Sequence, residues 1–192
     1  GCVLVKGGAV VGEGWHERAG GPHAEVHALN AAGESARGAT AYVTLEPCSH
    51  HGRTPPCAEA LINAGVSRVV AAMQDPNPQV AGRGLARLAA AGIAAECGLL
   101  EMEARELNVG FISRMSRGRP WVRLKLAASL DGKTALHNGV SQWITGPEAR
   151  RDGHAWRARA CAILTGIGTV RDDDPSLTVR DVVDRKSTRL NS

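Results

Sequence analysis

The chain contains 192 residues, carries a formal net charge of +4 and has an apolar fraction of 43%. This length suits one large domain or two small ones, and the apolar fraction is sufficient for a packed core without disulfide staples. No apolar run approaches the length of a membrane span, and the first ten residues lack the basic-then-apolar pattern of a signal peptide. The sequence therefore argues against a membrane partner.

The positive charge does not indicate a nucleic-acid partner. Arg185, Lys186 and Arg189 lie in the last eight residues and contribute +3, which leaves about +1 for the body of the chain. Only six residues are aromatic, too few for a base-stacking platform. The five cysteines are odd in number and two of them stand in a metal-binding pattern, so a reducing cytoplasm fits better than a disulfide scaffold.

Strand and helix signals alternate along the first part of the chain. Apolar segments at residues 2–5 and 9–14 flank a Lys-Gly-Gly turn and predict a hairpin. Further strands are expected at residues 41–45, 68–73 and 93–97, and helices at residues 23–32, 57–64, 84–91 and 100–111. This alternation favours a layered α/β domain with a largely parallel sheet.

Residues 113–120 are basic and rich in helix breakers, which indicates a domain boundary. Beyond it the patterns predict strands at residues 121–128 and 162–165, a helix at residues 147–159 and a glycine turn at residues 166–169. The chain begins in what resembles the middle of a strand and ends in a polar segment without pattern. We therefore expect a fragment truncated at both ends, with residues 184–192 as a non-native tail.

Four residues carry the strongest chemical signal: His23, Glu25, Cys48 and Cys57. One imidazole and two thiolates give zinc three protein ligands and leave a fourth position open. Glu25 is then a carboxylate close to the metal that can move a proton. This combination is the signature of the zinc deaminases, in which the glutamate acts as acid and base and is not a ligand. We expect His23, Cys48 and Cys57 as metal ligands and Glu25 as the catalytic residue.

A structural zinc site is the alternative interpretation. Such a site is closed by four ligands, and Cys2, Cys97 or His27 could supply the fourth. Structural sites typically pair close cysteines twice, whereas only one widely spaced pair exists here. Prolines also precede both His23 and Cys57, which places each at a helix start, where the helix dipole favours thiolates. The catalytic interpretation is therefore favoured.

The residues from Glu46 to Cys57 resemble the riboflavin-biosynthesis deaminases, because other zinc deaminases usually carry only two residues between these cysteines. Residues 75–78 and 82–84 are also similar to that family. Residues 123–133, 141–145 and 168–180 resemble the reductase half of the same bifunctional enzymes, a relative of the dihydrofolate reductase fold. The resemblance covers about residues 1–181.

The resemblance implies an α/β fold class in two parts. A cytidine-deaminase-like three-layer α/β/α domain would occupy residues 1–112, and residues 113–120 would form a linker. A partial dihydrofolate-reductase-like α/β domain would occupy residues 121–183. The family's first helix and its later glycine-rich cofactor loop would then lie outside this chain.

The implied function is zinc-dependent hydrolytic deamination of a diaminopyrimidinone that carries a phosphoribosylamino group, followed by NADPH-dependent reduction of its ribosyl chain to ribityl. The implied cofactors are Zn²⁺ and NADPH, and the partner is this phosphorylated small molecule, with a homo-oligomer left open. By the same resemblance, the deaminase contacts its substrate through His16, His50 and Arg53. NADPH contacts would be Ala127, Trp143, Thr169 and Asp173. The reductase would contact its substrate through Ser141, Arg157, Leu177 and Arg180.

Other readings stay open at the level of single residues and of the whole chain. His50 and Arg53 could simply order the cysteine loop, Arg157 and Arg180 could be surface charges, and Trp143 could belong to a core. The chain could also be a nucleoside or tRNA zinc deaminase, or a non-catalytic module stabilised by zinc. The long gap between the cysteines and the second unit speak against the first of these two.

Overall fold

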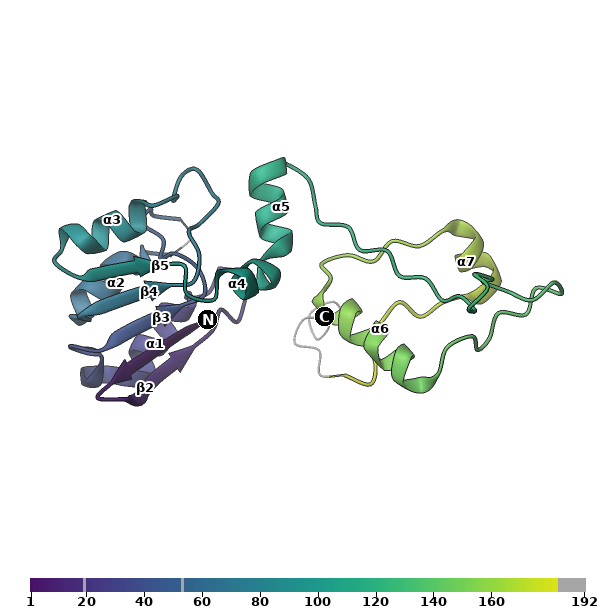
Figure 1. Ribbon diagram of the computed structural model, residues 1–192, viewed down its shortest axis with the longest axis horizontal. Coiled ribbons are helices and arrows are strands. Elements are labelled where there is room, and N and C mark those ends of the chain that lie inside the picture. The colour runs from purple at the N-terminus through teal and green to yellow at the C-terminus, as the bar shows by residue number, and fades with distance from the viewer. Residues whose placement is uncertain (19, 53, 183–192) are drawn as a thin grey trace. The chain divides into compact units, whose positions relative to one another are not determined.

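The computed structural model describes residues 1–18, 20–52 and 54–182, and the chain divides into two compact units, Gly1–Val122 and Arg123–Ser192 (Figure 1). The division follows the expected linker at residues 113–120, but the first five residues of that linker are helical, since they belong to α5 (Val109–Arg117). The expected non-native tail at residues 184–192 lies outside the described residues. Within the described residues, no helix is both long enough and apolar enough to cross a membrane.

Unit 1 is built on a five-stranded sheet with the order β2-β1-β3-β4-β5. Its strands are β1 (Cys2–Lys6), β2 (Ala9–Gly14), β3 (Thr40–Val43), β4 (Arg68–Ala71) and β5 (Ala94–Cys97). β1 pairs antiparallel with both β2 and β3, whereas β3, β4 and β5 run parallel. The tight Gly7–Gly8 turn, with positive φ at both residues, folds β2 back on β1 as predicted. The sheet is nevertheless mixed and not largely parallel as expected, because β1 is antiparallel to β3 as well.

The helices of unit 1 lie close to their expected positions. They are α1 (Ala24–Ala32), α2 (Cys57–Ala64), α3 (Arg83–Ala90), α4 (Glu101–Leu107) and α5, with a short 3-10 turn at Gly33–Ala36. The single helix expected at residues 100–111 is in fact two helices, α4 and α5. They separate at Asn108, whose side-chain amide donates to the Ala104 carbonyl at 2.9 Å and so ends α4.

The core of unit 1 follows the period-two alternation of its strands. Every second residue faces the helices, and these inward residues are buried: Cys2 and Leu4 on β1, Ala41 and Val43 on β3, and Val69 and Ala71 on β4. Three fully buried helix residues belong to the same apolar cluster: Ala28 of α1, Leu61 of α2 and Leu88 of α3. These helices therefore hold fixed positions on the sheet, and the candidate site lies where α1 and α2 begin.

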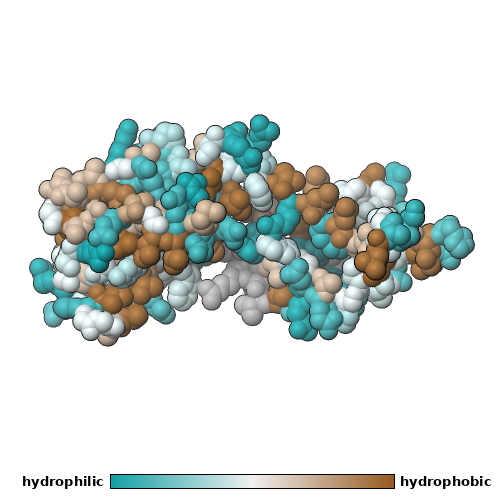
Figure 2. All heavy atoms as spheres, viewed as in Figure 1, coloured by the Kyte–Doolittle hydropathy of each residue, from teal (hydrophilic) through white to brown (hydrophobic). Residues whose placement is uncertain are grey.

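Unit 2 contains α6 (Pro147–Arg159) and α7 (Ile167–Asp173). The strands expected at residues 121–128 and 162–165 are not formed, and the expected turn at residues 166–169 is largely the start of α7. A strand needs a neighbouring strand to take up its backbone hydrogen bonds, and residues 123–182 contain no strand that could serve as that neighbour. Leu124, Leu126 and Leu164 are accordingly exposed, and Figure 2 shows apolar side chains among polar ones on the face in view.

Candidate metal centre

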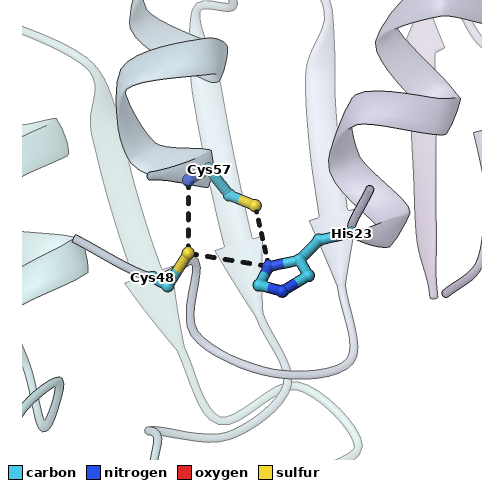
Figure 3. Close-up of side chains that lie close together, drawn as sticks. All are labelled: His23, Cys48 and Cys57. Carbon is cyan, nitrogen blue, oxygen red and sulfur yellow. Dashed lines mark hydrogen bonds between the residues drawn. The ribbon is translucent and has the colours of Figure 1, made fainter. Parts of the chain in front are cut away.

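Three side chains from three separate segments converge at the start of α1 and α2 (Figure 3). His23 is the N-cap residue of α1, Cys57 is the first residue of α2, and Cys48 lies in the loop after β3. The predicted helix starts at His23 and Cys57 are thus confirmed. Nδ1 of His23 lies 3.2 Å from Sγ of Cys57 and 3.6 Å from Sγ of Cys48.

These distances fit a zinc ion. Ligands held tetrahedrally at usual Zn–N and Zn–S distances lie about 3.6 Å apart, close to the two nitrogen–sulfur distances here. Within the part of the chain that the structure describes, only His23, Cys48 and Cys57 form a group whose ligand atoms all lie within 4.8 Å of one another. None of Cys2, Cys97 and His27, the candidates for the fourth ligand of a structural site, belongs to this group. Three protein ligands are typical of catalytic zinc.

The pKa values of the two thiols, Cys48 and Cys57, are shifted in opposite directions. A hydrogen bond from the Cys57 thiol lowers the pKa of Cys48 to about 4, and His23 and the backbone N–H of Cys57, 3.3 Å from Sγ of Cys48, act in the same direction. As the donor to that thiolate, Cys57 has a raised pKa. The hydrogen bond to Cys48 raises the pKa of His23. These hydrogen bonds thus favour the thiolate form of Cys48, the form that binds metal.

Glu25 lies in the first turn of α1 and is only 8% exposed. Burial raises the pKa of its carboxyl group above the ordinary range. It interacts electrostatically with Cys48 and His23 but does not belong to the three-residue ligand group. A buried carboxyl group that can hold a proton beside a metal site, without ligating, is suited to acid–base chemistry.

A pocket of about 220 Å³ opens beside the ligand group. Two of the expected substrate contacts, His16 and His50, line it together with His23, Cys48 and Thr54. Nδ1 of His16 donates to the Pro22 carbonyl at 2.9 Å, which leaves Nε2 for another partner. The third expected contact, Arg53, lies outside the described residues.

In unit 2 the structure brings together two of the expected substrate contacts, Arg157 and Arg180. Nη1 of Arg157 donates to the Thr178 carbonyl at 3.0 Å, and Nη1 of Arg180 donates to Oγ1 of the same residue at 3.1 Å. Burial and the charge of Arg180 lower the pKa of Arg157. Burial lowers the pKa of His154, and the same two guanidinium groups act in the same direction. These residues form a compact positive cluster.

The other residues expected in unit 2 are more scattered. Ser141 and Leu177 are exposed, Thr169 and Asp173 lie one turn apart on α7, and Ala127 lies in an irregular segment. Trp143 is 72% exposed, with the guanidinium of Arg150 4.6 Å from its ring centre. The alternative that Trp143 is a core residue is therefore wrong for this structure.

One buried carboxyl group near the site was not singled out from the sequence. Asp75 is 8% exposed, and burial raises its pKa, with smaller contributions in the same direction from Glu46 and Cys48, while the backbone N–H of Asn77 and the charge of His50 oppose the shift. Its Oδ1 accepts the backbone N–H of Asn77 at 2.8 Å in a turn after β4. The signal in the sequence was the Asp-Pro-Asn-Pro run after a strand, which indicates such a turn.

The comparisons with known proteins agree with these two units. Residues 1–73 match the cytidine and deoxycytidylate deaminase zinc-binding region, and residues 120–190 match the RibD C-terminal domain. The chain is 68% identical, over 94% of its length, to the riboflavin biosynthesis protein RibD of Escherichia coli, of which it covers 49%.

Solved structures give the same result. The structure of Acinetobacter baumannii RibD is 58% identical with a TM-score of 0.88, over 94% of this chain and 51% of that one. A Thermotoga maritima diaminohydroxyphosphoribosylaminopyrimidine deaminase/5-amino-6-(5-phosphoribosylamino)uracil reductase is 45% identical with a TM-score of 0.88, over 93% and 52%. The chain thus spans about half the length of the relatives that it matches. Over that span it belongs to the RibD family of riboflavin biosynthesis proteins.

Proposed function

We propose that unit 1 is a zinc-dependent hydrolytic deaminase that removes an amine from a diaminopyrimidinone bearing a phosphoribosylamino group, in riboflavin biosynthesis. The observation that carries the proposal is the His23, Cys48 and Cys57 group, open at a fourth position, with the buried carboxyl group of Glu25 beside it. The match of residues 1–73 to a deaminase zinc-binding region supports it.

The chain's own residues would divide the work. His23 and the two sulfurs would hold the ion, which when bound would lower the pKa of water from 15.7 to about 7 and so supply the nucleophile. Glu25 would accept one proton from the attacking water and pass it to a ring nitrogen as the C–O bond forms. It would then accept the second proton, from the hydroxyl now on the ring carbon, and pass it to the amine, which leaves as ammonia when the C–N bond breaks; the raised pKa of Glu25 suits both transfers. His16 and His50, in the adjoining pocket, and Arg53 contact the pyrimidine or its phosphoribosyl group.

Unit 2 would belong to the second activity of the parent protein, the NADPH-dependent reduction of the ribosyl chain. Arg157 and Arg180 would bind the substrate phosphate, because two adjacent guanidinium groups match a dianion, with Ser141 and Leu177 as further contacts. Ala127, Trp143, Thr169 and Asp173 would contact NADPH. We also propose that the parent protein acts in the cytoplasm on this small molecule, without a nucleic-acid partner.

Ammonia release tests the deaminase proposal. The purified chain loaded with zinc is assayed on the phosphoribosylamino diaminopyrimidinone, on cytidine and on tRNA. We expect activity on the first substrate alone, and a fall of about 10²–10⁴-fold in Glu25→Gln, because the amide cannot transfer the proton. Release from cytidine or tRNA alone would instead support a nucleoside or nucleic-acid deaminase.

Two controls separate chemistry from folding. Glu25→Gln should still bind zinc, because Glu25 is outside the ligand group. Glu13→Gln makes the same change at an exposed position on β2 and should retain full activity. If Glu25→Gln bound zinc and deaminated at the wild-type rate, the chain would be better described as a zinc-stabilised module.

A further inference from the structure

Glu46 is a buried carboxylate that accepts hydrogen bonds from four backbone N–H groups. Glu46 is only 3% exposed. Oε2 accepts from Asp75 at 3.1 Å and from Gly82 at 2.9 Å, and Oε1 accepts from Gly84 at 2.9 Å and from Leu85 at 3.2 Å. No part of this network comes from its own neighbours in the sequence, since the donors lie 29 to 39 residues away.

This carboxylate replaces the missing cap of α3. The N-cap residue of α3 is Gly82, which has no side chain and adopts a positive φ of 84°, and α3 has no side-chain cap of its own. The first N–H groups of a helix have no partner inside the helix, and a negative charge is favoured there by the helix dipole. Glu46 satisfies these donors from another segment, so its position is fixed by the start of α3.

Glu46 is followed two residues later by the metal ligand Cys48. The backbone N–H of Glu46 donates to the Met73 carbonyl at 3.0 Å, and the Cys48 carbonyl accepts from Ala58 of α2 at 3.1 Å. Pro47, which lies between them, packs closely on Gly84: a Cβ added to Gly84 would be 1.9 Å from the Pro47 carbonyl oxygen. The short path from Glu46 to Cys48 is therefore fixed by Met73, just after β4, and by α3 and α2 together.

We propose that Glu46 is a positioning residue for the zinc site: by capping α3 across the fold, it holds the Pro47–Cys48 segment so that the Cys48 sulfur faces His23 and Cys57. The inference rests on the zinc site of the proposed function. Of the three ligands, His23 and Cys57 are carried by helices α1 and α2, whereas Cys48 lies in a loop (Figure 3). Cys48 is the ligand that depends on such a fixed support.

The test is the zinc affinity of the 192-residue chain, measured by competition with a chromogenic chelator. Glu46→Gln keeps the shape of the side chain, but its NH₂ group would face backbone N–H donors. We expect zinc binding about 10–100-fold weaker, the range typical for loss of groups that orient metal ligands. Cobalt in place of zinc should show an altered thiolate-to-metal absorption band, which a loss of stability alone would not produce.

Glu96→Gln is the matched control. Glu96 also joins two elements, through a 2.8 Å ion pair with Arg68 between β4 and β5, but the pair is exposed and far from the ligands in sequence. Its zinc affinity should stay within about twofold of wild type, because exposed ion pairs contribute little. Wild-type affinity and an unchanged cobalt spectrum in Glu46→Gln would overturn the inference while leaving the zinc site intact.

A measurement on the wild type covers the case in which Glu46→Gln does not fold. Zinc binding should slow hydrogen exchange at the Asp75, Gly82, Gly84 and Leu85 amides, because it fixes the acceptor to which they bond. Unchanged exchange at these amides on zinc binding would refute the coupling between Glu46 and Cys48. If the wild type bound no zinc at all, the site and the inference would both be wrong.

Discussion

At the scale of single residues, the metal centre shows how the hydrogen-bond partners of a side chain set its pKa. Cys48 and Cys57 are chemically identical side chains, yet one has its pKa lowered to about 4 and the other has its pKa raised. The difference arises because Cys48 accepts hydrogen bonds from Cys57 and from His23, while Cys57 donates. The site thus favours a thiolate at Cys48, and metal binding requires Cys57 to lose its proton as well.

Zinc should therefore stabilise the folded chain. A ligand that binds only the folded state at about 100 times its dissociation constant adds about 2.7 kcal/mol to the free energy of unfolding. Urea titrations of the chain, followed by circular dichroism with zinc and with a chelator, measure this difference. We expect the zinc-dependent shift to vanish in His23→Ala, which removes one of three ligands.

Cys97→Ser provides the comparison for that titration. Cys97 is an exposed thiol at the end of β5 and does not belong to the ligand group. The variant should show the full zinc-dependent shift. A shift that survived in His23→Ala would place the ion elsewhere and would contradict the three-ligand site.

At the scale of elements, two glycines on β2 decide where α1 can lie. A Cβ at Gly14 would be 2.5 Å from the Ala24 carbonyl oxygen and 2.6 Å from Cβ of His27, and a Cβ at Gly12 would be 2.4 Å from the Ala28 carbonyl oxygen. Only glycine allows this strand and this helix to approach so closely. The first turn of α1, which carries Glu25 and follows His23, therefore owes its position to Gly14.

Gly14→Ala should destabilise unit 1 by about 1–3 kcal/mol, the usual cost of overpacking. It should also weaken zinc binding, because α1 must move and carries His23 with it. Gly110→Ala in α5 is the contrasting substitution, since no atom lies within 4 Å of the new Cβ apart from its chain neighbours and the backbone of its own helix, and alanine is the better helix former. Denaturant unfolding should show a loss of stability for the first and none for the second.

Equal stability of Gly14→Ala and wild type would show that α1 can withdraw from β2 without cost. In that case the close approach would not hold the first turn of α1, and zinc affinity would be expected to remain unchanged as well.

Elements also show which parts of the molecule the sequence could predict. His23 and Cys57 were predictable because prolines mark the helix starts that hold them, and their spacing carries the chemistry in a short stretch. Glu46 was not, because its role consists of contacts to residues 75–85, which no local pattern reveals. Asn108 divides one expected helix into two through a side-chain bond that the apolar period does not encode.

At the scale of the whole molecule, the two units differ in how they are held. Unit 1 contains every buried residue among those that the structure describes, and its sheet shares one core with α1, α2 and α3. In unit 2 the alternating pattern of Leu124 and Leu126 predicts a strand that is not formed, because a strand depends on a partner and not on its own sequence alone. The fold of unit 1 was therefore the more predictable.

Unit 1 should fold and bind zinc without unit 2. Its core cluster, from Cys2 to Ile93, and its three metal ligands all lie within Gly1–Val122, and stability comes mainly from apolar area removed from water. Residues 1–122 expressed alone should show the zinc affinity and the denaturant midpoint of the longer chain, each measured by the assays above. A zinc affinity more than about tenfold weaker would mean that residues beyond Val122 support the site, since a factor of ten corresponds to about 1.4 kcal/mol.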